Sequence, residues 1–192
     1  MAEAKRIVCL TVAFNLDEVF QKVISQDNDV LRYIVKDDDL GDGEVIGRDR
    51  DVLFAAGGYL GKDSLVNFLG ERGNPLNRND YIHNKFMLVD PLGKDPLVVT
   101  GSANFSRPSQ RSNDENMLVI RGDTRVADIY FGEFMRIFDH HYTRYIVRKL
   151  ETSDSGNDPN AGYLKTAADQ WVPSHFDSKS HKAKRRKYFV EG

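Results

Sequence analysis

The 192-residue sequence contains one cysteine, one tryptophan and six prolines, and it lacks any long apolar run. A lone cysteine excludes an internal disulfide and is typical of a reducing cytoplasm, so we expect a cytoplasmic protein with Cys9 as a small core residue. No apolar stretch approaches the ~20 residues of a membrane helix, and the start MAEAKRIVCL does not have the form of a signal peptide. The sequence therefore predicts no stable membrane insertion.

The sequence also lacks an excess of charge of either sign. Its formal net charge of −2 excludes a global attraction to nucleic acid or to acidic membranes, and its 40% of hydrophobic residues is typical of a globular protein. The charge is nevertheless uneven, because residues 27–51 are rich in acids and residues 179–187 carry six lysines and arginines. The basic run has two open interpretations, a set of contacts to nucleic-acid phosphates or a solvated C-terminus.

The apolar periodicity predicts an α/β fold, in which helices flank a mixed β-sheet. Runs of β-branched and apolar residues predict strands at 6–14, 31–37, 51–60, 82–90, 96–102 and 115–122. Helical spacing predicts a first helix capped by Asn15, a short helix within 62–73, and a long helix from Asp123 or Thr124 to about Leu150, with Asp123 as its N-cap. We expect residues 1–150 to form the main domain, followed by a linker and a basic tail over 151–192. The segment 103–114 is expected to be a polar loop.

The polar residues of one predicted hairpin carry the chemistry. Side chains alternate along a strand, so His83 and Lys85 should project on the same side. The returning strand ends in Gly101-Ser102-Ala103-Asn104, which should place Ser102 and Asn104 beside the histidine, while Gly101 permits a close approach of the backbone. An imidazole, an ammonium, a hydroxyl and a carboxamide suit a phosphate diester. Taken singly, a His-x-Lys pair is more often a solvated surface pair, and Gly-Ser-x-Asn is an ordinary loop.

The order and spacing of these residues resemble the HKD motif of the phospholipase D superfamily. The matching residues are His83, Lys85 and Asp90, followed by the Gly101–Asn104 segment, and Glu115 matches the acidic residue that follows the motif. The gap between Asp90 and Gly101 is longer than the usual spacing, which we attribute to a longer hairpin tip. The resemblance implies a phospholipase D-like fold with a single HKD-motif domain.

The resemblance also implies phosphodiester cleavage without metal or cofactor. His83 would attack phosphorus to form a phosphohistidine, while Lys85 and Asn104 would hold the phosphoryl oxygens. Ser102 would assist them, and Glu115 would fix the tautomer of a catalytic imidazole by a hydrogen bond. Asp90 belongs to the motif, although it is expected to shape the strand end rather than to touch substrate. Four further positions are assigned to substrate binding: Gly101, Ser102, Arg107 and Arg111.

The mechanism needs a second imidazole, and the sequence contains only one such motif. Two chains could form a homodimer in which each gives one motif, which we favour because Met1 and a full first strand suggest a self-standing unit. Alternatively, the chain is the C-terminal half of a two-motif enzyme and is inactive alone. The expected activity is hydrolysis of phospholipid or of nucleic acid, and the competing hypothesis is a binding module of the same fold without turnover. His140 and His141 point about a quarter-turn apart on their helix, which argues against a shared metal site.

Overall fold

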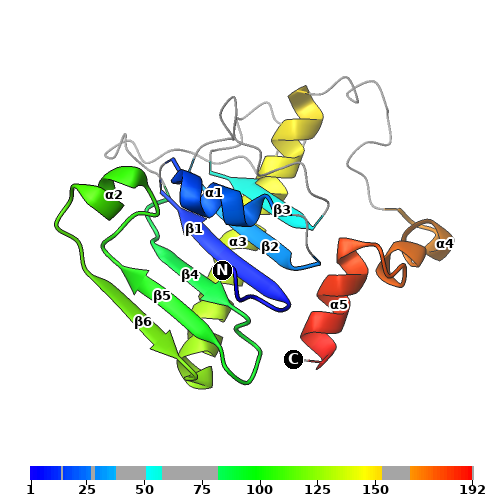
Figure 1. Ribbon diagram of the computed structural model, residues 1–192. Coiled ribbons are helices and arrows are strands. Elements are labelled where there is room, and N and C mark those ends of the chain that lie inside the picture. The colour runs from blue at the N-terminus through cyan, green and yellow to red at the C-terminus, as the bar shows by residue number, and fades with distance from the viewer. Residues whose placement is uncertain (14, 27–28, 38–50, 58–81, 153–164, 192) are drawn as a thin grey trace.

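The computed structural model describes residues 1–13, 15–26, 29–37, 51–57, 82–152 and 165–191. The helix predicted within 62–73, the acid-rich loop at 38–50 and most of the predicted linker lie outside the described residues. Figure 1 shows a twisted sheet with helices on both sides and the C-terminal helices packed near one end of it.

The described strands form one six-stranded mixed sheet in the order β3-β2-β1-β4-β5-β6. The first three strands, β1 (Ile7–Val12), β2 (Leu31–Lys36) and β3 (Val52–Ala56), run parallel to one another. The last three, β4 (Phe86–Val89), β5 (Leu97–Gly101) and β6 (Met117–Arg121), join antiparallel, with β4 beside β1. The α/β class predicted from the sequence is confirmed.

Helices cover both faces of the sheet because each strand is apolar on both sides. On one face the short helix α1 (Glu18–Ile24) packs through Leu16 and Ile24 against strand residues such as Leu10. On the opposite face the 29-residue helix α3 (Thr124–Thr152) packs through Phe134 and Phe138. The predicted long helix is thus confirmed, and Asp123 caps it by accepting a hydrogen bond from the backbone N–H of Val126 at 3.0 Å.

Two details of the sequence prediction are wrong. Asp17, not Asn15, caps α1, because its carboxylate accepts a hydrogen bond from Val19 N at 2.9 Å. The polar segment after Asn104 contains a short helix, α2 (Arg107–Arg111), where a loop was expected. Pro108 stands in the first turn of α2, where its missing N–H removes no helical hydrogen bond.

The predicted strand 82–90 is shorter than expected. Its partner β1 ends at Val12, and pairing between the two strands runs only from Val8 and Val89 to Leu10 and Met87. The hydroxyl of Thr11 then bonds both backbone groups of Phe86, donating to its carbonyl oxygen at 3.1 Å and accepting from its N–H at 2.9 Å. Residues 82–85 therefore enter the sheet as an irregular segment, and His83 lies just before β4.

The basic run is a helix packed on the domain. After α4 (Ala168–Trp171) and the 3₁₀ turn Pro173–His175, residues His181–Glu191 form α5. Tyr188 is buried in the core cluster beneath α3, and its hydroxyl accepts a hydrogen bond from Leu92 N at 3.0 Å. Lys184 donates to Asp29 at 2.8 Å and to the buried Asp51 at 2.7 Å. Of the two interpretations left open for the basic run, a solvated C-terminus does not fit this inner side of α5.

Candidate active site

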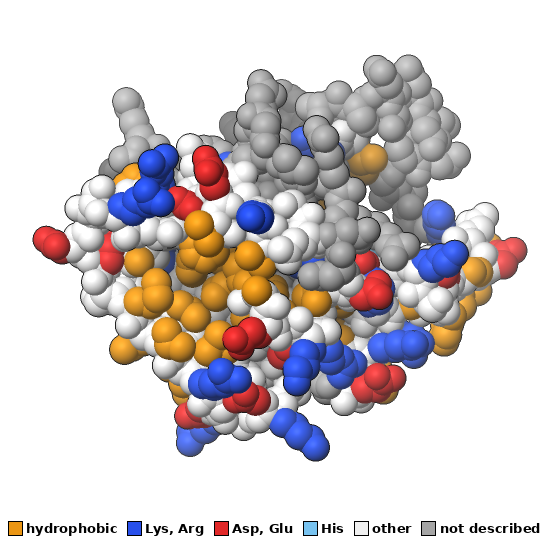
Figure 2. Space-filling model, in the orientation of Figure 1, with side chains coloured by type: hydrophobic (Ala, Val, Ile, Leu, Met, Phe, Trp, Pro, Cys, Tyr) orange, Lys and Arg blue, Asp and Glu red, His pale blue; other side chains and the backbone are white. Residues whose placement is uncertain are grey.

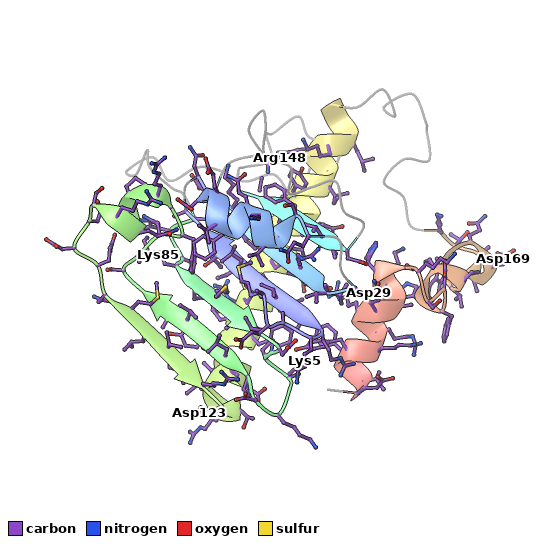
Figure 3. All side chains as sticks on the ribbon, viewed as in Figure 1. Lys5, Asp29, Lys85, Asp123, Arg148 and Asp169 are labelled. Carbon is purple, nitrogen blue, oxygen red and sulfur yellow. The ribbon has the colours of Figure 1, made fainter. Side chains whose placement is uncertain are left out.

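Most of the predicted site residues, Asp90 excepted, lie at the end of the sheet where the parallel strands finish. The carboxyl ends of β1 and β5 meet the starts of β4 and β6 at this edge, because β4 and β6 run antiparallel to their neighbours. Figure 3 labels Lys85 there, below α2 and beside α1. In α/β sheets the carboxyl ends of parallel strands are the usual place for ligand sites.

Lys85 occupies the approach to β4. Its Nζ donates a hydrogen bond to the backbone carbonyl of His83 at 3.0 Å, which bends the ammonium back over the His83 segment. Partial burial lowers the pKa of Lys85, and the nearby carboxylate of Glu115 opposes that shift. The His83 side chain itself is exposed to solvent. The Lys85 ammonium thus adjoins the backbone of the His83 segment at the open end of the sheet.

Ser102 and Glu115 form a hydrogen-bonded pair between the ends of β5 and β6. The Ser102 hydroxyl donates to Glu115 Oε2 at 2.5 Å and accepts from Asn116 N at 3.0 Å, while Asn113 donates to Glu115 Oε1 at 3.3 Å. These bonds, the one from Ser102 foremost, lower the pKa of Glu115 and keep it ionised beside Lys85. Within the described chain Glu115 bonds no imidazole, so the expected hydrogen bond to a catalytic imidazole stays a prediction.

Gly101 is required by the packing of β6 against β5. A Cβ at this position would collide with the backbone carbonyl of Asn116 and would lie 2.9 Å from Met117 Cα. The glycine therefore lets β6 approach closely enough for Ser102 to reach Glu115. This packing explains the glycine without a contact to substrate.

Asn104 faces a pocket of about 600 Å³ between α1 and α2. Its Oδ1 is buried and has no hydrogen-bond partner among the described residues, an arrangement that costs free energy unless a ligand or water completes it. Arg107 also lines this pocket, whereas Arg111 is exposed at the far end of α2 and does not. The pocket extends the site from the sheet edge towards the first turn of α1.

Asp90 lies at the other end of β4, away from His83 and Lys85. Its carboxylate accepts three backbone hydrogen bonds of 2.9 Å, from the N–H groups of Lys5, Arg6 and Ile7. Its φ of +46° lies in the left-handed region, which Asp tolerates better than most residues. In this structure Asp90 closes the β4–β5 hairpin and fixes the start of β1.

The sequence pattern did not indicate three residues that lie near the site and support it. Asp37, which the sequence placed in an acid-rich stretch, accepts a hydrogen bond from Ile82 N at 2.7 Å and so holds the residue before His83. Ser109 and Asn113 both bond Glu115 from the α2 segment. Their local sequence does not differ from that of an ordinary loop. Only the folded structure shows that the chain brings these residues back to the site.

The remaining histidines do not join the site. His140 and His141 are ring neighbours on α3, with centroids 4.9 Å apart, and His175 and His181 lie in the C-terminal helices. Burial, followed by repulsion from His140 and nearby arginines, lowers the pKa of His141 to about 4. Within the described segments, no three His, Cys, Asp or Glu side chains are placed to hold a metal ion. Nor does any described helix combine the length and apolar character of a membrane span.

Comparison with known proteins gives consistent similarities. A family model described as "Cardiolipin synthase, PLD-like domain" matches residues 58–140. The mitochondrial cardiolipin hydrolase of Xenopus laevis is 31% identical over 93 residues, which make up 48% of this chain and 40% of that protein. The chain therefore spans less than half the length of this relative.

Two solved structures also resemble the chain. NucT from Helicobacter pylori aligns with a TM-score of 0.52 and 17% identity, over 72% of this chain and 82% of that one. Nuc from Salmonella typhimurium, described as a phospholipase D family member, aligns over the same shares with a TM-score of 0.48 and 16% identity. The first of these likenesses supports the fold alone.

The mixed sheet with helices on both faces defines a phospholipase D-like α/β fold. The family-model match and the similarity to a cardiolipin hydrolase agree with this fold. The chain is thus similar to proteins of the phospholipase D superfamily, as the spacing of its HKD-like residues predicted.

Proposed function

We propose that the chain is a metal-independent phosphodiesterase in which His83 is the nucleophile. The supporting observation is the gathering of Lys85, Ser102 and Glu115 at one sheet edge, directly beside the His83 segment. Lys85 supplies a positive charge to the phosphoryl oxygens, and Asn104 supplies amide donors. Glu115 keeps Ser102 and Lys85 in place by hydrogen bonding and charge.

The proposed reaction has two steps. A nitrogen of His83 attacks phosphorus, the bond from phosphorus to the leaving oxygen breaks, and a second imidazole gives that oxygen its proton. The same second imidazole then takes a proton from water, which attacks the phosphohistidine and restores His83. The substrate is a phospholipid or a nucleic acid, and the name of the Xenopus relative favours a phospholipid such as cardiolipin.

The second imidazole comes from another copy of the chain, docked on an apolar surface next to Lys85. We call this surface the β4–β6 face; Met117 and Val119 are its exposed residues, Leu97 is partly exposed, and Met87, Val89 and Val99 are buried at its base. Residues paired across a ladder point to the same side, and Val119 pairs with Val99, a core residue of the α1 side. Met117 and Val119 are nevertheless 54% and 63% exposed, because α1 does not extend over them. Figure 2 shows the resulting orange patch below α1.

A second copy on this face would bring its own His83 segment towards the first, because the face adjoins the catalytic end of the sheet. A face with this much exposed apolar surface commonly marks an interaction site. A two-fold arrangement then makes one shared site near the axis, to which each chain gives one histidine. The second half of a two-motif enzyme would need the same face for its missing half.

The test combines light scattering with hydrolysis of bis(p-nitrophenyl) phosphate in EDTA. We expect a dimer with activity that falls about a thousandfold or more in His83→Ala, while His140→Ala, an exposed histidine outside the site, serves as the matched control. Parallel assays on cardiolipin vesicles and on single-stranded DNA identify the substrate class. Loss of activity in EDTA would overturn the metal-independent mechanism, and a folded dimer without turnover would favour the binding-module hypothesis.

Mixing variants tests the shared site directly. If each reaction needs both histidines, random pairing of equal amounts of wild-type and His83→Ala chains leaves about a quarter of the dimers intact. Activity per total chain should therefore be about a quarter of the wild-type value after subunit exchange. A value of one half would mean that each chain works alone. A silent monomer would instead favour half of a two-motif enzyme.

A further inference from the structure

A second pocket lies at the C-terminal side of the molecule, with a volume of about 360 Å³. Helix α5 and the turn Pro173–His175 form one side of it, and β3 and α3 form the other. The lining residues are Leu53, Tyr142, His175, His181, Lys182, Arg185, Arg186 and Phe189. The pocket is separate from the candidate active site, since it shares no lining residue with the pocket beside Asn104 and contains none of the predicted site residues.

Positive charge in this pocket exceeds the acids that could balance it. Neither Lys182 nor Arg186 forms an ion pair with an acidic residue of the described chain, and Arg185 lies 3.9 Å from Asp139. Asp29 and Asp51, the two acids paired with α5 near its start, are both engaged by Lys184. At least two full positive charges are therefore left to attract an anion.

The same excess of positive charge affects the pKa of His181. Burial is the main cause that lowers its pKa, and Lys182, Arg185 and His175 lower it further, against an opposing effect of Asp51. The nearby arginines are also held in place. Arg186 donates a hydrogen bond to the His175 carbonyl at 3.0 Å and stacks over Phe176 at 4.6 Å, while Arg185 lies over the ring of Phe189 at 5.7 Å. Cations fixed in advance lose less entropy on binding an anion.

Apolar side chains line the β3 and α3 side of the pocket and the C-terminal end of its α5 side. Leu53 is part of the buried core, Tyr142 stacks on Phe138, and Phe189 stacks on Phe131. A ligand that fills the pocket should therefore combine an anionic group with an apolar part. A bare anion would satisfy the cations and leave these walls in contact with water.

We propose that this pocket binds a small organic phosphate, with the phosphate beside Lys182 and Arg186 and its apolar part against Tyr142 and Phe189. The phosphate could be carried by a nucleotide or by a short alkyl chain, and the two share the same recognition chemistry. Both have several oxygens that accept charge-assisted hydrogen bonds. This site is independent of the proposed phosphodiesterase activity.

The chain supplies its own reporter for this pocket. Trp171 is the single tryptophan, and its ring centroid lies 5.8 Å from that of His175. Ligand at His175 should therefore change the tryptophan emission. We would titrate the protein with AMP, hexyl phosphate, inorganic phosphate and adenosine, in the His83→Ala background so that the active site cannot turn over ligand.

We expect a saturable change with AMP or hexyl phosphate below about 10 mM, a weaker one with inorganic phosphate and none with adenosine. A response to AMP identifies a nucleotide, and a response to hexyl phosphate alone identifies an alkyl phosphate. Lys182→Gln and Arg186→Gln should each weaken binding about fivefold, while Lys187→Gln on the same helix should not. Because Lys182 is exposed, its variant should fold even if Arg186→Gln loosens the tail. The proposal is overturned by the absence of saturation with both organic phosphates, or by equal affinities in Lys182→Gln and Lys187→Gln.

Discussion

Replacing Asp90 by alanine should destabilise the fold strongly, although Asp90 lies outside the apolar core. The carboxylate accepts 2.9 Å hydrogen bonds from three consecutive backbone amides at the start of β1, two of which are partly buried. A hydrogen bond to a charged group contributes roughly 1.5–3 kcal/mol, but water can replace the carboxylate at the exposed amide and in part at the others. We therefore expect Asp90→Ala to lower the free energy of unfolding by about 2–4 kcal/mol.

Urea unfolding followed by Trp171 fluorescence and by circular dichroism measures this change. For a chain of this size the expected loss corresponds to a fall in melting temperature of about 5–15 °C. Asp90→Gly should lose less stability than Asp90→Ala, because glycine adopts the φ of +46° without strain. The matched control is Asp95→Ala in the same hairpin, whose carboxylate bonds the exposed Arg121 at 2.7 Å and should matter little. Equal stabilities of Asp90→Ala and Asp95→Ala would refute the argument that Asp90 fixes β1.

Two further predictions concern ionisable pairs. Lys184→Met removes the ammonium from Asp51, whose side chain is 2% exposed, and should cost about 3 kcal/mol or more in urea unfolding, with partial recovery in the double variant Lys184→Met/Asp51→Asn. Burial lowers the pKa of Lys184, but the hydrogen bonds to Asp29 and Asp51 outweigh burial and raise the pKa above its ordinary value. The stabilisation by this ion pair should therefore be complete below pH 10.5 and lost as pH rises through the higher folded-state pKa. An alkaline unfolding profile that Lys184→Met leaves unchanged would argue against this assignment. Ser102→Ala should raise the pKa of Glu115 towards its ordinary value of 4.5, which an NMR titration of the side chain can follow, and an unshifted curve would mean that the 2.5 Å bond does not hold in solution.

The strand pattern was predictable, but the length of the catalytic strand was not. Alternation places Phe86 and Leu88 in the core cluster on the α3 side and Met87 and Val89 in the cluster on the α1 side, as local sequence indicates. The irregular start before Phe86 depends instead on where β1 ends, 75 residues away along the chain, and on the Thr11 hydroxyl that closes the ladder. A single-sequence pattern does not contain that pairing information.

The candidate site likewise has a part that the sequence predicted and a part that it did not. Motif spacing was enough to predict that Lys85, Ser102 and Glu115 would lie near one another, because a hairpin and its next strand form locally. The support from Asp37 was not predictable, since its contact with Ile82 joins residues 45 positions apart. The roles of these residues in turnover stay predictions, which the histidine variants and the mixing experiment address.

The C-terminal basic run shows that charge in a sequence and charge available to a partner differ. Of its six cations, Lys184 is neutralised by Asp29 and Asp51, Arg185 lies near Asp139, and Arg186 keeps its charge but is held against Phe176 within the pocket. Three exposed lysines are left, at positions 179, 182 and 187. Single-stranded nucleic acid bound through all six cations would give a slope of about −4 in log affinity against log salt, whereas three give about −2. The packing of α5 therefore weakens the case for this segment as a nucleic-acid arm, and places its remaining charge beside a pocket suited to a small anion.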